Sequence, residues 1–220
     1  MKIEIVKTAD GSHSLFNAEL NEHYHSIHGA LQESKHVFIE AGLNFCFERS
    51  ESEISILEIG FGTGLNALLT CIKAEMKNRK VEYDSLEAFP LGKNISDELN
   101  YGELLGEQKV FEKLHSSNWD CSEKISPCFI LNKISTSVQC FVPYKKYDLI
   151  YFDAFAPNKQ PEMWTKEIFE KVFSLLNPNG ILVTYCAKGE VKRNLKAAGF
   201  KIESLPGPKG KREMTRAIKP

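Results

Sequence analysis

The chain has 220 residues, and its 28 Lys or Arg against 29 Asp or Glu give a formal net charge of −1. The hydrophobic fraction of 42% is ordinary for a globular protein, and no apolar run reaches the roughly 18 residues of a membrane span. This length suits one domain, or one domain with a short appendage. Composition therefore argues against a membrane protein and gives no overall positive charge of the kind that binds nucleic acid.

The six cysteines include no C-x-x-C pair and the six histidines show no metal-ligand spacing, so we expect no metal site and no disulfide framework. The first residues, Met1-Lys2-Ile3-Glu4, lack a signal-peptide pattern. We therefore expect a cytoplasmic protein with free thiols.

The first 44 residues show no regular alternation of strands and helices, and a polar, histidine-rich stretch at 21–28 interrupts weakly strand-like pieces. We predict an N-terminal appendage over 1–44 and a larger domain over 45–220.

Strand and helix patterns alternate through the larger domain. We expect strands over 55–59, 81–87, 129–134, 147–152, 181–186, 201–205 and 213–218, and helices over 64–76, between 91 and 114, over 161–176 with a stop at 177–180, and over 191–198. This order predicts an α/β fold with a doubly wound, largely parallel, Rossmann-like sheet.

The first predicted strand runs into glycines at alternate positions, Gly60, Gly62 and Gly64, preceded by Glu58. A dinucleotide fingerprint needs G-x-G-x-x-G instead. The observed spacing resembles the first motif of S-adenosylmethionine-dependent methyltransferases, with a plain glycine turn and a nicotinamide site as alternatives. The residues that we expect at the cofactor are Glu58, Gly60, Phe61, Gly62, Thr63, Gly64 and Asn66.

Two further strand ends carry carboxylates. Glu87 follows the next predicted strand, where an acidic residue usually accepts hydrogen bonds from ribose hydroxyls. Asp153 follows the apolar strand 147–152, and a carboxylate there suits an aliphatic amine as methyl acceptor. The alternatives are an exposed acid at the end of a strand for Glu87 and a loop cap for Asp153.

Five segments together resemble one family, the methyltransferase domain of MnmC and the stand-alone MnmD proteins, which modify the wobble uridine of certain tRNAs. These segments are Gly60–Asn66, Glu87–Leu91, Asp153–Pro157 followed by Pro161–Thr165, Lys211–Met214, and the N-terminal Tyr24–Ala30. The resemblance runs through most of the chain.

The resemblance implies a Rossmann-like class I methyltransferase fold, S-adenosylmethionine as methyl donor, and the amine of 5-aminomethyl-2-thiouridine as acceptor, giving 5-methylaminomethyl-2-thiouridine. Asp153 matches the family's catalytic carboxylate. Bifunctional members carry a second, flavin-containing domain, for which 220 residues leave no room, so we expect no FAD. The stretch Lys133–Val138 lacks the acid that contacts adenine in many relatives, and Ser135, Ser137 or backbone atoms would replace it.

A tRNA substrate requires stacking and phosphate contacts. From Cys186 onward ten Lys or Arg stand against three Glu, which fits either an anticodon-stem contact or a solvated basic surface. A wobble base lies in a single-stranded loop, where aromatic side chains hold it. We predict contacts to the substrate from Phe155, Pro157, Trp164 and His25, with Trp164 as a core residue the alternative, and phosphate contacts from Lys188, Lys192, Arg193, Lys211 and Arg212.

The chemistry depends on the pKa of Asp153. An aliphatic amine titrates near pH ~10 and an ordinary Asp near ~4, so full proton transfer would cost about 8 kcal/mol. A plain general-base role is therefore costly unless burial raises this pKa. We expect Asp153 chiefly to orient a neutral amine for in-line attack and to accept or relay its proton late.

Three rival functions remain: a methyl or aminopropyl transferase for a small amine, a nicotinamide-dependent oxidoreductase, and a non-catalytic tRNA-binding module.

Overall fold

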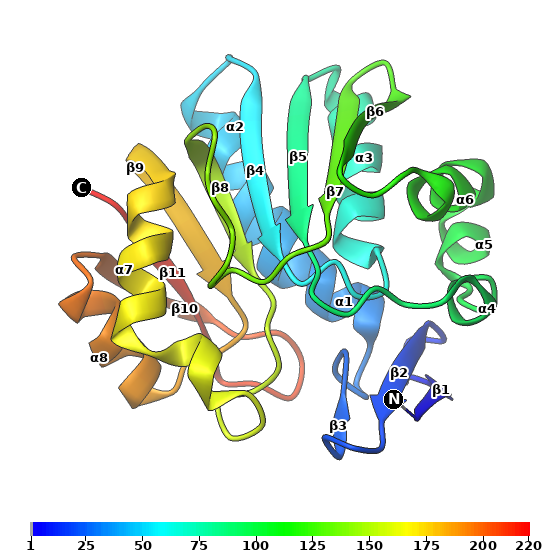
Figure 1. The fold of residues 1–220 in the computed structure, drawn as a ribbon, viewed down its shortest axis with the longest axis horizontal. Helices are drawn as coiled ribbons and strands as arrows, with labels where there is room; N and C mark the ends of the chain where they lie inside the picture. Colours follow the sequence, from blue (N-terminus) through cyan, green and yellow to red (C-terminus); the bar gives the residue numbers. More distant parts are fainter. Residues whose placement is uncertain (1) are drawn as a thin grey trace.

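The computed structural model describes residues 2–220 and is built around an eight-stranded sheet (Figure 1). The strands lie in the order β10-β11-β9-β8-β4-β5-β7-β6. Their bounds are β4 (Ile54–Ile59), β5 (Val81–Leu86), β6 (Cys121–Ser126), β7 (Phe129–Ile134), β8 (Tyr147–Phe152), β9 (Leu176–Thr184), β10 (Lys201–Pro206) and β11 (Glu213–Ile218).

The centre of this sheet is parallel, since β4 pairs in parallel with β5 and β8, β5 with β7, and β8 with β9. β11 is antiparallel to both of its neighbours, β9 and β10, and β6 is antiparallel to β7. The predicted doubly wound, largely parallel sheet is confirmed, and β6 is an edge strand that the pattern reading missed.

Helices cover both faces of the sheet. They are α3 (Leu65–Lys77), α4 (Lys93–Ser96), α5 (Tyr101–Leu105), α6 (Gln108–Ser116), the 3-10 helix η2 (Pro161–Trp164), α7 (Lys166–Leu175) and α8 (Gly189–Ala197). In Figure 1, α7 lies in front of the sheet and α3 behind it. Alternate residues of β8 enter two separate cores, Leu149 and Tyr151 on one face and Ile150 and Phe152 on the other. This explains why the strand reads as one continuous apolar run.

The N-terminal region has two parts. A small antiparallel sheet contains β1 (Ile3–Lys7), β2 (His13–Asn17) and β3 (Glu22–His23). An unbroken helical stretch follows, from α1 (Ala30–Ser34) through the π-helix η1 (Lys35–Asn44) to α2 (Phe45–Arg49).

This helical stretch crosses the predicted boundary at residue 44 and contacts α3, β8 and β9. Val37, Phe38 and Leu43 are buried in the same core as the central strands. A Cβ at Gly42 would lie 3.1 Å from Val183 Cγ2, a tight contact, so a glycine, although a weak helix former, lets the helix approach the sheet closely. The division of the chain at residue 44 stays a prediction.

Two predicted helices take a different form. The helix expected over 161–176 is split into η2 and α7, because Thr165 acts as the N-cap of α7 and its Oγ1 accepts a hydrogen bond from the Ile168 N–H. The expected stop at 177–180 belongs to the irregular first half of β9, where the register with β8 shifts. The helical region between 91 and 114 consists of three short helices, α4, α5 and the start of α6.

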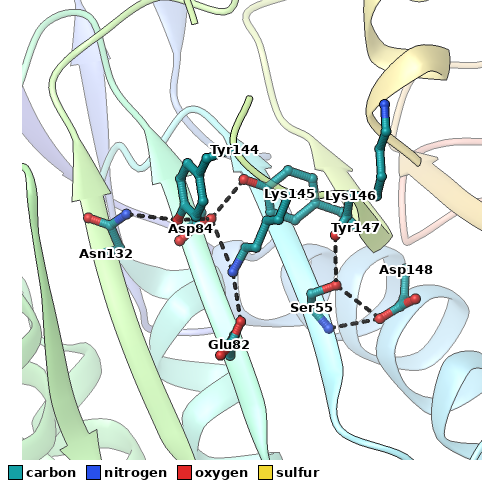
Figure 2. Close-up of polar contacts among 9 residues, drawn as sticks. All are labelled: Ser55, Glu82, Asp84, Asn132, Tyr144, Lys145, Lys146, Tyr147 and Asp148. Atoms are coloured by element: carbon teal, nitrogen blue, oxygen red, sulfur yellow. Dashed lines mark hydrogen bonds and ion pairs between the residues drawn. The ribbon is translucent and has the colours of Figure 1, made fainter. Parts of the chain in front are cut away.

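The connection from β7 to β8 has no helix and is held down by a polar network on the sheet (Figure 2). Asp84 in β5 is 2% exposed, and its Oδ2 accepts hydrogen bonds from the Tyr144 hydroxyl at 2.6 Å and the Tyr147 hydroxyl at 2.7 Å. Lys145 Nζ lies 2.9 Å from a carboxylate oxygen of Glu82 and 3.3 Å from Asp84. These partners compensate the burial of the Asp84 carboxylate and anchor the loop that leads into β8.

Across residues 2–220, no helix is long and apolar enough to cross a membrane. All six cysteines are unpaired thiols, as expected.

Candidate active site

A cavity of about 890 Å³ opens at the carboxyl ends of β4, β5, β7 and β8. Its other walls come from the N-terminal segment between residues 17 and 33, from Tyr185 just after β9, and from Lys211 in the hairpin that joins β10 to β11. The volume is in the range of small-molecule sites, and the position is where open α/β sheets bind ligands.

The glycine loop forms the floor of this cavity. Gly60, Gly62 and Gly64 have φ angles of +96°, +48° and +72°, a region that other residues avoid. At Gly60 a Cβ would lie only 2.8 Å from the carbonyl oxygen of Asp153, so a side chain would separate the loop from β8. Of the predicted loop residues, Gly60, Phe61, Gly62, Thr63 and Asn66 line the cavity.

Gly64 lies outside the cavity lining and is the N-cap of α3, while Glu58 lies beneath the loop. Glu58 is fully buried, and its Oε2 accepts a hydrogen bond from the Ser85 hydroxyl at 2.6 Å. Its other oxygen has no partner, and burial raises the pKa of this carboxyl to about 8. Direct contact between Glu58 and a cofactor stays a prediction.

Glu87 lines the cavity and also holds the loop in place. One carboxylate oxygen accepts a hydrogen bond from the Gly62 N–H at 3.0 Å, and the other accepts one from the Phe89 N–H at 2.9 Å. Each oxygen has further lone pairs for ribose hydroxyls. The glycines expose only backbone to the cavity, and the Glu87 carboxylate beside them accepts hydrogen bonds. This combination of groups fits S-adenosylmethionine.

The end of β7 supplies Thr136, Ser137 and Val138 to the cavity wall. Ser135, the other hydroxyl suggested for the adenine contact, is not in the wall, and its N–H donates to Asp120 Oδ1 at 2.9 Å. Ser137 is therefore the better placed of the two.

Asp153 follows β8 and is half-buried in the cavity wall. Asn66 Nδ2 donates a hydrogen bond to Asp153 Oδ2 at 2.9 Å, and the backbone N–H of Asp153 donates to the Ile59 carbonyl at 3.1 Å. Burial raises the pKa of the Asp153 carboxyl to about 7, with a smaller contribution in the same direction from the charge of Glu33. This raised pKa lowers the cost of a proton transfer to Asp153.

Aromatic and imidazole side chains form the outer wall. The rings of Tyr24 and Phe155 meet edge to face with centroids 5.0 Å apart, and both line the cavity. His25 Nε2 lies 2.8 Å from Thr63 Oγ1, which ties the N-terminal segment to the glycine loop, and burial lowers the pKa of His25 to about 4. Tyr24, Glu33 and Tyr185 were not predicted. No local pattern marks Tyr24 and Glu33, whereas Tyr185 directly follows β9 and the strand-end argument could have found it.

Several predicted substrate residues lie outside the cavity. Trp164 is 3% exposed, packs against Phe152, and donates from Nε1 to the Phe155 carbonyl at 2.8 Å, so it is a core residue that supports Phe155. Lys192 Nζ is bound to Glu213 at 2.7 Å. The predicted residues absent from the cavity wall are Pro157, Trp164, Lys188, Lys192, Arg193 and Arg212.

Lys211 is in the wall, but as an internal ion-pair partner of Glu33, with 2.5 Å between Nζ and Oε1. Among residues 2–220 no group of three or more His, Cys, Asp or Glu side chains is arranged to hold a metal ion.

The strand order, with β11 antiparallel between β9 and β10, and the glycine loop with Glu87 beside it define a Rossmann-like methyltransferase fold. Residues 98–220, more than half of the chain, match the family described as "S-adenosyl-L-methionine-dependent methyltransferase". The chain belongs to this family.

The chain also resembles individual proteins with established names. The chain is similar to the "tRNA 5-methylaminomethyl-2-thiouridine biosynthesis bifunctional protein MnmC" of Leptospira interrogans, with 34% identity over 89% of this chain and 32% of the relative. The protein of the same name from Campylobacter hominis is 28% identical over 92% of this chain and 31% of its own length. The chain thus spans about a third of the length of these relatives.

The chain also resembles proteins whose structures have been solved. The crystal structure of MNMC2 from Aquifex aeolicus matches with a TM-score of 0.80 and 26% identity, over 98% of this chain and 69% of that one. Spermidine synthase from Thermotoga maritima, at a TM-score of 0.56 and 14% identity over 100% of this chain and 73% of that one, shares the fold.

Proposed function

We propose that this protein transfers a methyl group from S-adenosylmethionine to the primary amine of 5-aminomethyl-2-thiouridine at the wobble position of tRNA. The proposal is carried by Asp153, a carboxylate of raised pKa that faces the same cavity as the glycine loop. It is supported by the likeness to the bifunctional MnmC proteins and to MNMC2. A tRNA substrate would place the reaction in the cytoplasm.

The methyl donor, when bound, supplies a sulfonium methyl group. Gly60 to Thr63, Asn66 and Glu87 would hold it, and Ser137 would lie on the adenine side. The acceptor base would stack against Phe155 and Tyr24, whose rings meet edge to face, with the Tyr24 ring beside Gly62 of the glycine loop.

Asp153 would bind the acceptor amine as an ammonium ion, take one proton on Oδ1 or Oδ2, and leave the nitrogen lone pair free. A carboxyl pKa of about 7 narrows the gap to an amine near ~10, so the proton transfer costs about 4 kcal/mol rather than about 8. Asn66 keeps the carboxylate oriented through its hydrogen bond to Oδ2. Asp153 would therefore act both as an orienting group and as a proton acceptor.

We further propose that exposed basic residues in the C-terminal part of the chain contact the phosphates of the anticodon stem. The exposed candidates are Lys188, Arg193 and Arg212, with Lys192 less available because it is paired with Glu213. Lys211 is directed into the cavity wall instead.

The test is methyl transfer from labelled S-adenosylmethionine to tRNA that carries 5-aminomethyl-2-thiouridine, with nucleoside analysis by mass spectrometry. Unmodified tRNA and the polyamines putrescine and spermidine are the controls. Label in 5-methylaminomethyl-2-thiouridine supports the proposal. Label in a polyamine with none in tRNA would instead establish the small-amine transferase.

A further inference from the structure

The wall beside Asp153 contains an ion pair that joins the two ends of the chain. Lys211 Nζ, in the hairpin between β10 and β11, lies 2.5 Å from Glu33 Oε1 in α1. The Glu33 side chain is only 8% exposed, and the Lys211 side chain is 34% exposed. Both residues line the cavity, so the pair belongs to its inner surface and is not an exposed surface contact.

Each partner is held by a second contact that leads to the site. The other carboxylate oxygen of Glu33 accepts a hydrogen bond from the Ser26 N–H at 2.8 Å, next to His25. Lys211 Nζ lies 3.9 Å from the centroid of the Tyr185 ring, a cation–π contact. The Tyr185 hydroxyl donates to the Ala154 carbonyl at 2.8 Å, the residue directly after Asp153. The pair is thus connected to the backbone that carries Asp153.

The pair also contributes to the electrostatic environment of Asp153. The charge of Glu33 favours the protonated carboxyl, whereas the charge of Lys211 favours the carboxylate. The titratable groups whose charges interact with Asp153 are Glu33 in α1, Glu58 in β4, Tyr83 in β5, Tyr185 after β9 and Lys211 in the hairpin. The pKa values of both tyrosines are raised, so both stay neutral near pH 7. Glu33 and Lys211 therefore supply opposing charges whose balance affects Asp153.

We propose that Glu33 and Lys211 are positioning residues for the proposed methyl transfer. Through Tyr185 they fix the backbone next to Asp153, and their opposing charges set the balance between its protonated and ionised forms. The expected effect on kcat rests on the proposed function, whereas the expected effect on the ionisation of Asp153 does not. Removing Lys211 leaves Glu33 as an unpaired negative charge in the wall, which favours protonated Asp153. Removing the charge of Glu33 has the opposite effect. The prediction that Lys211 binds a tRNA phosphate is replaced by this role.

The first experiment needs no substrate. Protein labelled with ¹³C at the aspartate carboxyl carbon is titrated by NMR, and the Asp153 resonance is assigned from its loss in Asp153→Asn. We expect Lys211→Gln to raise the Asp153 midpoint and Glu33→Gln to lower it, each by about half a pH unit or more. Lys211→Arg should restore the midpoint. Lys201→Gln and Glu48→Gln, at exposed positions outside the cavity, are controls for loss of the same charges.

The second experiment follows kcat and KM for tRNA against pH. We expect the pH of half-maximal kcat to move in the same direction as the NMR midpoint, with kcat lowered about tenfold at pH 7 in Lys211→Gln. KM for tRNA should change less than about twofold, since Lys211 does not reach phosphate in this role. A midpoint that stays at its wild-type value in both folded single variants overturns the proposal.

The double variant Glu33→Gln/Lys211→Gln leaves no unpaired charge in the wall and covers the case in which a single variant fails to fold. Wild-type kcat in this double variant also overturns the proposal, because the contact with Tyr185 is lost. If wild-type protein fails to methylate the tRNA while the NMR midpoints move as expected, the proposed function is wrong and the coupling to Asp153 stands.

Discussion

Replacement of Asp153 by Asn separates proton acceptance from orientation. In the wild type, Asn66 Nδ2 donates to Asp153 Oδ2 at 2.9 Å. The amide oxygen of an Asn at this position can accept the same hydrogen bond, so the geometry of the site is kept. The amide takes up no proton. A general base contributes about 10²- to 10⁴-fold, so kcat at pH 7 should fall at least about 100-fold, equivalent to about 3 kcal/mol of transition-state stabilisation.

The pH dependence gives the sharper result. In the wild type, kcat should rise from pH 5 and level off above about 7, where Asp153 is ionised. In Asp153→Asn the amine must lose its proton to solvent, so kcat should rise about tenfold per pH unit between about pH 7 and 9.

The assay is single-turnover methylation of aminomethylated tRNA, with donor affinity measured by calorimetry to confirm that the site is intact. Asp97→Asn, an exposed position outside the cavity, is the matched control. An Asn variant within about threefold of wild-type kcat at pH 7, or one whose profile still levels off near 7, would refute the proton-acceptor role.

Three further predictions concern stability, donor binding and tRNA binding. Glu58 has a folded-state pKa of about 8 against 4.5 in the unfolded chain, so its contribution to stability is present below pH 4.5 and is lost as pH rises through 8. The free energy of unfolding should therefore fall toward pH 9 by up to about 5 kcal/mol in the wild type, and much less in Glu58→Gln, as urea denaturation would show. His25→Phe removes the hydrogen bond to Thr63 and should weaken donor binding by about three- to tenfold in calorimetry, and unchanged affinity would contradict the link between the N-terminal segment and the glycine loop. Alanine at three basic positions together should flatten the plot of log Kd for tRNA against log salt by about 2 to 3, and an unchanged slope would remove them from the phosphate contact: Lys188, Arg193 and Arg212.

The elements that could be predicted from sequence are those that a local pattern of apolar and turn residues marks. The strands Phe129–Ile134, Tyr147–Phe152 and Glu213–Ile218 have the predicted bounds, because short apolar runs flanked by polar or turn residues mark buried strands. The helical stretch Ala30–Arg49 was missed, since a glycine, β-branched residues and a histidine weaken its helical pattern and packing on the sheet stabilises it.

The site divides in the same way. Gly60, Glu87 and Asp153 follow strands of one sheet, so the topology alone predicts that they meet, and all three line the cavity. Tyr24 and Glu33 reach it from the N-terminal segment, and only the fold shows their proximity. Tyr185 directly follows β9, which is parallel to β8, so the same strand-end rule applies to it and was not used. Basic residues in the C-terminal part were assigned by charge, which cannot distinguish Lys211, half-buried and paired with Glu33, from its exposed neighbour Arg212.

The bond between His25 and Thr63 has a consequence for how the cavity could have arisen. The Rossmann-like sheet supplies the glycine loop and the carboxylates at its strand ends, whereas the three-stranded sheet and the segment after it supply a separate wall of the same cavity. Transplanting that segment onto a related methyltransferase core, with Thr at the position of Thr63, would be a direct route to changing which acceptor the core admits.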